Sequence, residues 1–290
     1  MTTLGAVYLP QWPPERLRDV ARAAEETGLE ELWLWEDCFR ESGVASAAAV
    51  LAWTDRLHVG IGLLPVPLRN VAITAMETAT LHRLFPGRVT IGLGHGVQEW
   101  MGQVGARVDA PVTLLSEHLT ALAALFRGEV VTTAGRYVNL EGVRLDWPPK
   151  TAPALVVGAG RPRTLRLAGR IADGTILTGG TSPDGVRQAR RHIDEGRAAA
   201  GRSDPHAVTV YVMAATGPGA ATRLEAAQRA WGMDLAQEVG VAGDAAAIAA
   251  AVGRWADAGA DTVVLQPTSD EPDPEGFVRF VASRVRPLVS

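Results

Sequence analysis

Short runs of apolar and β-branched residues alternate along the whole chain with longer amphipathic segments. The apolar runs, such as TVYVMAA at 209–215, are almost continuously hydrophobic instead of alternating between apolar and polar positions. This pattern is typical of parallel strands that are covered on both faces, while the amphipathic segments indicate helices. Strands are predicted at 5–9, 31–35, 57–63, 89–93, 154–157, 174–177, 208–214 and 261–265.

Helices are predicted between these strands, for example at 15–27, where Gly28 would end the helix, and at 71–84, where the sequence FPG follows. Eight βα units in 290 residues predict an α/β fold of the (β/α)8 TIM-barrel type. A doubly wound sheet is the alternative, because strand order does not follow from the pattern.

One segment breaks the alternation of strands and helices. Residues 128–149 show β-branched alternation around Ala134-Gly135, which predicts a hairpin inserted after the fourth helix. Residues 217–243 are predicted to be irregular. No repeat or linker divides the sequence, so residues 1–290 are expected to form a single domain.

Composition limits the classes of protein to consider. The chain is 47% apolar, enough for a large core, and it contains no run of about 18 apolar residues that would span a membrane. Its start lacks a basic segment and reaches Pro10 within one short apolar run, so no secretory signal is expected. The single cysteine, Cys38, fits a reducing cytoplasm, and the net charge of −4 argues against a nucleic-acid partner.

Glycine, histidine and acidic residues gather at one end of the predicted barrel. The second strand leads into Glu36, Asp37 and Cys38, and the fourth into the sequence GLGHG, which contains His95. The opposite strand ends carry ordinary turn sequences. Because barrel enzymes place their chemistry at the carboxyl ends of the strands, this asymmetry predicts an active site there.

The fifth and sixth strands are followed by glycine-rich turns. Pro162 suits the first turn of a helix, so the preceding backbone N–H groups and an arginine form a candidate anion site. Tight structural turns are the alternative for either motif alone, and together the two motifs favour a phosphate. The predicted phosphate ligands are Gly158, Ala159, Gly160, Arg161, Pro162, Thr178, Gly179 and Gly180.

Individual side chains have competing interpretations. Asp37 follows two tryptophans into the barrel mouth, which favours a ligand contact over an exposed loop acid. His95, flanked by glycines, is the best acid or base among the six histidines. Cys38 is expected to be a small buried residue instead of a nucleophile. Trp100 and Met101 either roof a substrate cavity or pack the loop. No cluster has metal-ligand spacing, so no metal is predicted.

Three segments resemble those of the luciferase-like flavin and deazaflavin oxidoreductases. WLWEDCF at 33–39 is similar to the family's W-x-x-D-H-F, residues 63–96 resemble its long central signature, and residues 158–180 resemble its G-S-G-P-K-A-x-R-L-A-G-R-x-A-D-G-x-I segment. The three occur in the family's order and cover essentially the whole chain. The FPGR form is most similar to the branch that uses coenzyme F420, a deazaflavin, in place of FMN.

The resemblance implies a function and partners. It implies an F420-dependent oxidoreductase that transfers a hydride to or from an unidentified small molecule, and a homodimer. A reduced-FMN monooxygenase working with a separate flavin reductase is the alternative. A cofactor-binding barrel without turnover is the third possibility.

The resemblance also implies roles for residues at matching positions. Asp37 falls on the acid that hydrogen-bonds the cofactor head, and His95 and Gly96 fall on positions that line the ring. A non-proline cis peptide is implied behind the ring, within Gly62, Leu63 and Leu64.

Three positions depart from the family pattern. Cys38 replaces a histidine acid/base of many members, Val97 replaces a glutamate, and Thr181 replaces a basic residue that holds a substrate phosphate. Oxidation of a sugar phosphate is therefore not expected.

Overall fold

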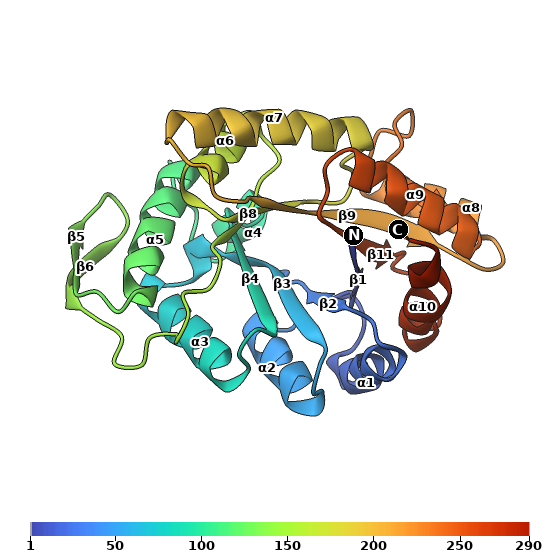
Figure 1. Ribbon diagram of the computed structural model, residues 1–290, viewed down its shortest axis with the longest axis horizontal. Coiled ribbons are helices and arrows are strands. Elements are labelled where there is room, and N and C mark those ends of the chain that lie inside the picture. Colours follow the sequence, from blue (N-terminus) through green and yellow to red (C-terminus); the bar gives the residue numbers. More distant parts are fainter. Residues whose placement is uncertain (1, 290) are drawn as a thin grey trace.

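A closed parallel barrel forms the centre of the protein (Figure 1). The computed structural model describes residues 2–289. The sheet closes because β8 pairs with β9 while β1 pairs with both β2 and β11, all in parallel register. The predicted TIM barrel is thus confirmed and the doubly wound sheet is wrong. The barrel strands are β1 (Thr3–Val7), β2 (Glu31–Leu34), β3 (His58–Pro65), β4 (Val89–Gly94), β7 (Val156–Gly158), β8 (Gly174–Leu177), β9 (Ala207–Ala215) and β11 (Thr262–Pro267).

Helices surround the barrel on its outside (Figure 1). None of those in residues 2–289 is long and apolar enough to cross a membrane. Short 3-10 turns at Pro14–Arg16, Val66–Leu68 and Arg286–Leu288 and a π-helical turn at Val281–Val285 complete the helical parts. The helices are α1 (Leu17–Thr27), α2 (Gly43–Trp53), α3 (Val71–Leu84), α4 (Gln98–Gln103), α5 (Pro111–Phe126), α6 (Pro162–Ile171), α7 (Pro183–Ala199), α8 (Ala220–Ala230), α9 (Ala245–Asp257) and α10 (Pro274–Phe280).

Local sequence signals account for several boundaries. Gly28 ends α1 with φ of 73°, in the left-handed region that glycine adopts without steric penalty. Asn70 caps α3, since its side chain accepts a hydrogen bond of 2.9 Å from the N–H of Ala72. Pro162 occupies the first position of α6, as predicted. The bounds of α3 and β8 coincide with those expected from the sequence, and the first strand begins two residues earlier than expected.

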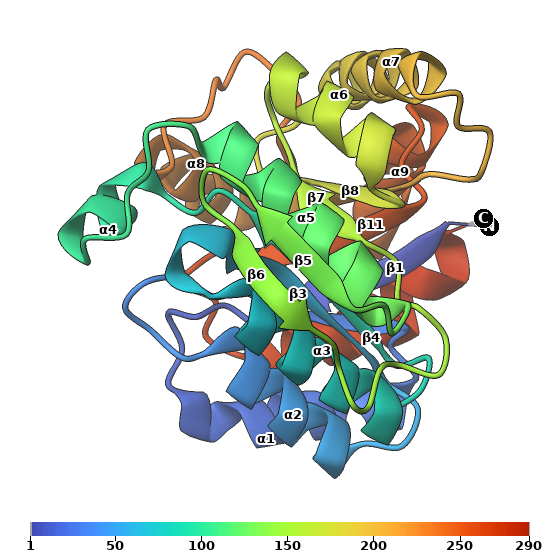
Figure 2. The same ribbon diagram turned by 90° about the vertical axis from the view of Figure 1, so that its left-hand side faces the viewer.

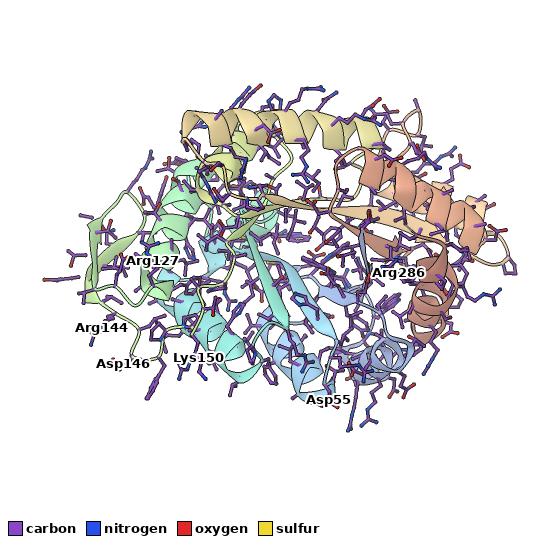
Figure 3. All side chains as sticks on the ribbon, viewed as in Figure 1. Asp55, Arg127, Arg144, Asp146, Lys150 and Arg286 are labelled. Atoms are coloured by element: carbon purple, nitrogen blue, oxygen red, sulfur yellow. The ribbon has the colours of Figure 1, made fainter. Side chains whose placement is uncertain are left out.

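The predicted hairpin is present as β5 (Val131–Ala134) and β6 (Asn139–Val143), an antiparallel pair that follows α5. It lies outside the barrel against α5 (Figures 1 and 2), and Arg144, Asp146 and Lys150 lie on this outer side (Figure 3). Glu117 of α5 fixes its turn by accepting hydrogen bonds from three consecutive backbone N–H groups, those of Arg136, Tyr137 and Val138.

The expectation of an irregular segment at 217–243 is wrong. This segment contains α8 and the short strand β10 (Gly240–Ala242), which pairs in parallel with β9. The buried positions of α8 are Ala220, Leu224 and Gln228. A buried stripe with one large apolar residue gives only a weak periodic signal, which explains why the sequence pattern missed the helix.

A histidine is buried at the amino-terminal end of β9. His206 is 8% exposed, and its Nε2 lies 2.8 Å from the hydroxyl of Thr175. Burial, reinforced by the positive charges of Arg197 and Arg190, lowers the pKa of His206 to about 4.

This lowered pKa predicts acid sensitivity. Because the folded state disfavours the protonated form, the stabilisation is complete above the unfolded pKa of 6.5 and is lost as the pH falls toward 4. The unmodified protein should lose unfolding free energy between pH 7 and pH 4. The His206→Gln variant should lose about 3 kcal/mol less over the same range. Urea unfolding at both pH values measures it, with His192→Gln on α7 as the surface control. A loss equal to that of the unmodified protein would contradict the assignment.

Candidate active site

A cavity of about 470 Å³ opens at the carboxyl ends of the barrel strands. Its wall brings together residues that are far apart in the sequence, from β2 to the segment after α8. The predicted residues in this wall are Asp37, Gly62, Leu63, His95, Gly96, Gly158, Ala159, Gly160, Arg161, Thr178 and Gly179. Wall residues that were not among the predicted site residues are Trp35, Glu36, Pro65, Val97, Trp100, Thr164, Tyr211 and Trp231.

Three predicted site residues lie outside this wall. Leu64 is 1% exposed and packs in the core, because successive side chains of a strand point to opposite faces and Leu63 takes the inward one. Pro162 is the first residue of α6 and forms part of the first turn of this helix. Gly180 has φ of 88°, and a Cβ at this position would face Met233. The structure does not bring these three residues to the cavity.

The floor of the cavity is built around Leu63. The Gly62–Leu63 peptide is cis, at the place that the family resemblance implied. Tyr211 of β9 donates a hydrogen bond of 3.4 Å from its phenol to the carbonyl oxygen of Gly62. A Cβ on Gly158 would lie 1.9 Å from Cδ2 of Leu63, so only glycine leaves room for this leucine. The glycine of the fifth strand end therefore serves packing as well as any ligand.

The two acids that follow β2 occupy different environments. The carboxylate of Glu36 has two partners. Its Oε1 accepts a hydrogen bond of 3.1 Å from Arg69, and its Oε2 accepts one of 2.9 Å from the N–H of Gly43 at the start of α2. Asp37 is half-buried, and this partial burial raises its pKa, with Arg40 opposing the shift. Glu36 is thus held by two partners, while Asp37 is the carboxyl group suited to exchange a proton.

Cys38 does not form a nucleophilic pair. Burial raises the pKa of its thiol, and the carboxylates of Glu36 and Asp37 raise it further. The thiol therefore stays protonated near neutral pH, as expected from the sequence. The peptide between Cys38 and Phe39 is also cis, which the sequence did not indicate.

His95 faces the cavity as a neutral imidazole. Its Nε2 lies 3.2 Å from the hydroxyl of Thr164, in the first turn of α6. Burial lowers the pKa of His95, which favours the neutral ring over imidazolium. Thr164 was missed, although its place two residues after Pro162 put it beside the predicted anion site.

The loops after β7 and β8 offer donors to an anion. The backbone N–H groups of Gly160, Arg161 and Gly179 have no hydrogen-bond partner within residues 2–289, and α6 starts without a side-chain cap. Gln266 is 2% exposed, its Oε1 has no partner in the described chain, and this atom would lie 3.0 Å from a Cβ on Gly179. A helix start with free N–H groups and a nearby guanidinium suits a phosphate.

Aromatic side chains form another part of the wall. The ring centroids of Trp35 and Trp231 lie 6.0 Å apart in an edge-to-face arrangement. The centroids of Trp35 and Tyr211 lie 5.6 Å apart. Trp100 of α4 lines the same cavity. The sequence left open whether Trp100 and Met101 roof a cavity or pack the loop. Trp100 reaches the cavity, whereas Met101 is fully buried. Among residues 2–289, no group of three or more His, Cys, Asp or Glu side chains could hold a metal ion.

The sequence model of the family described as luciferase-like monooxygenase matches residues 2–272. The 5,10-methylenetetrahydromethanopterin reductase of Methanolobus tindarius is 31% identical over 73% of this chain and 64% of its own length. The F420-dependent glucose-6-phosphate dehydrogenase of Nakamurella multipartita is 32% identical over 64% of this chain and 62% of its own. This chain thus spans less than two thirds of these relatives.

The fold has close counterparts among solved structures. The coenzyme F420-dependent tetrahydromethanopterin reductase of Methanopyrus kandleri superposes with a TM-score of 0.85 over 100% of this chain and 99% of its own. Its sequence identity is 21%, so this likeness concerns the barrel.

The Glu36–Arg69 contact should stabilise the cavity wall. Both side chains are largely buried, at 12% and 14% exposed, and Arg69 also binds Glu77. We expect Arg69→Met to lower the unfolding free energy by about 3 kcal/mol, because it leaves a buried carboxylate without its partner. Arg127→Met, which breaks the exposed pair with Glu129, should lower the unfolding free energy far less, because water screens this pair. Urea unfolding compares the two, and equal losses would contradict the prediction.

Proposed function

The chain belongs to the luciferase-like monooxygenase family, and we propose that it is an oxidoreductase that transfers a hydride between coenzyme F420 and a small organic substrate. The observation that carries this proposal is the cavity itself, which joins a glycine-lined anion end to a floor of Leu63 and an aromatic wall. The relative from Nakamurella multipartita, which is F420-dependent by name, supports the deazaflavin over FMN.

The residues of the cavity fit a phosphorylated cofactor with a planar ring. The free N–H groups of Gly160, Arg161 and Gly179 suit the phosphate, since they satisfy its oxygens without burying a bare cation. The orphaned Oε1 of Gln266 lies beside Gly179 and can accept a hydrogen bond from a polar ligand. The floor formed by Leu63 suits the face of a ring.

Bound F420 supplies a carbon that gives or takes a hydride as a two-electron unit. Leu63 would support the ring from the barrel side, and the aromatic wall would shield part of it from water. The carboxyl group of Asp37 holds the proton that accompanies the hydride. Nε2 of the neutral His95 ring, which contacts Thr164, is the nitrogen that would share a hydrogen bond with the substrate, because Nδ1 is buried. The thiol of Cys38 takes no part as a base.

Two other functions stay as alternatives. A reduced-FMN monooxygenase with a partner reductase fits the family name, since the anion end and the floor suit either ring. A barrel that binds the cofactor without turnover fits the replacements at Cys38 and Val97. Oxygen consumption identifies the first, and a bound cofactor that never changes redox state with any acceptor or donor identifies the second.

We infer a homodimer. Three apolar side chains project from α3 into solvent, since Ile73 is 42%, Met76 56% and Leu84 65% exposed. Trp53 at the end of the neighbouring α2 is 36% exposed. Such a face suits contact between copies of the chain. Light scattering that reports a monomer at micromolar concentration would remove this inference.

Cofactor binding is the direct test of the proposed function. Titration with F420 should change its fluorescence at micromolar concentration, and FMN should bind more weakly. Gly160→Val should lower F420 affinity more than about tenfold, because a Cβ there meets no protein atom within 4 Å and projects beside the proposed phosphate. Gly179→Val is less suitable, since its Cβ would crowd Gln266. Normal affinity in a folded Gly160→Val variant would place the phosphate elsewhere, and FMN binding without F420 binding would favour the monooxygenase.

The proton role of Asp37 separates turnover from binding. Asp37→Asn keeps the shape of the side chain but cannot exchange the proton, so we expect kcat to fall by about 100-fold with any carbonyl compound that oxidises the reduced cofactor. Cofactor affinity should change by no more than about fivefold, the value of one neutral hydrogen bond. A kcat within about threefold of the unmodified enzyme would exclude Asp37 from proton transfer.

A further inference from the structure

The charged side chains of the cavity wall are unevenly placed. Within the described residues, the wall contains only three of them, Glu36, Asp37 and Arg161. Arg161 precedes α6 in the glycine-rich loop, at the anion end. The part of the cavity near the end of β2 therefore contains two acidic groups and no basic one.

This part of the wall is otherwise apolar and aromatic. Trp35 and Trp231 pack edge to face, and Trp100 and Val97 contribute from the segment after β4. Trp231 is 48% exposed and Val97 46% exposed, so large apolar surfaces at the rim remain uncovered. A ligand with an apolar body would remove this surface from water, and a ring could pack against the tryptophans.

An anionic substrate group would be poorly placed here. Two basic side chains lie near these acids, and neither lines the cavity. Arg69 already binds both Glu36 and Glu77. Arg40, which favours the charge of Asp37, is exposed and donates a hydrogen bond to the carbonyl oxygen of Pro10. A phosphate or carboxylate would lose its hydration next to Glu36 without gaining a cation. An ammonium group would gain little electrostatic attraction from Glu36, because Arg69 already compensates the charge of this residue.

We propose that the substrate is an uncharged molecule with an aromatic or cyclic apolar body, held by Trp35, Trp100 and Trp231. This inference rests on the function proposed above, since it takes the anion end of the cavity to be filled by the cofactor. Sugar phosphates and carboxylic acids are rejected at the acidic, aromatic end.

Binding of matched probes to the cofactor-loaded protein tests the inference without turnover. Acetophenone is the neutral probe, benzoate is its anionic counterpart of similar shape, and benzyltrimethylammonium is the cationic one. Calorimetry should show acetophenone binding at least about tenfold more tightly than benzoate or glucose 6-phosphate. Equal or tighter binding of an anion would overturn the proposal, and so would a clear preference for the ammonium probe.

Variants locate the probe in the cavity. Trp231→Ala should weaken acetophenone binding at least about fivefold, whereas Trp147→Ala on the exposed hairpin side should leave it unchanged. Val97→Lys should add the missing cation and raise benzoate affinity about tenfold relative to acetophenone. If Trp231→Ala and Trp147→Ala behave alike, the aromatic wall does not bind the probe.

The outcomes separate this inference from the proposed function. The experiment can be run with whichever cofactor the protein binds, so failure of F420 binding would overturn the proposed function alone. Normal F420 binding with no preference for the neutral probe would overturn the substrate class alone.

Discussion

Closure of the parallel sheet through the β8–β9 pairing is the constraint on which the site depends. Because every barrel strand runs in the same direction, closure brings all their carboxyl ends to one rim. Residues as distant in sequence as Glu36 and Trp231 then line one cavity. The hairpin outside α5 could be inserted without disturbing this rim, since it lies on the outer side of the barrel (Figures 1 and 2).

Two adjacent acids then acquire different properties from their surroundings. Glu36 turns toward Arg69 and the start of α2, whereas Asp37 is half-buried and Arg40 is the group that favours its charge. Partial burial, together with the same acids, raises the pKa of the Cys38 thiol. A thiol beside carboxylates cannot replace a histidine as a base, so proton transfer at this rim falls to Asp37 and His95 under the proposed function.

Sequence periodicity predicted the barrel and its hairpin because parallel strands and tight turns have local signals. It also placed Asp37, His95 and Gly160 at the correct rim, since each directly follows a strong apolar run. It missed α8, whose buried stripe contains alanine and glutamine, and with it the position of Trp231. Tyr211 was missed for another reason: it lies within a strand, and only closure of the barrel directs its phenol to Gly62.

The two ends of the cavity use different parts of the chain, and this difference limits what substitutions can change. Under the proposed function, the anion end uses the backbone N–H groups of Gly160 and Gly179, which no side chain could supply. The aromatic end uses Trp35, directly after β2, together with side chains on α4 and after α8, and these last two segments lie outside the barrel sheet. Replacing Val97 or Trp231 therefore leaves the strands and the glycine-rich loops as they are. Under the proposed function, substrate choice can change while the cofactor stays in place.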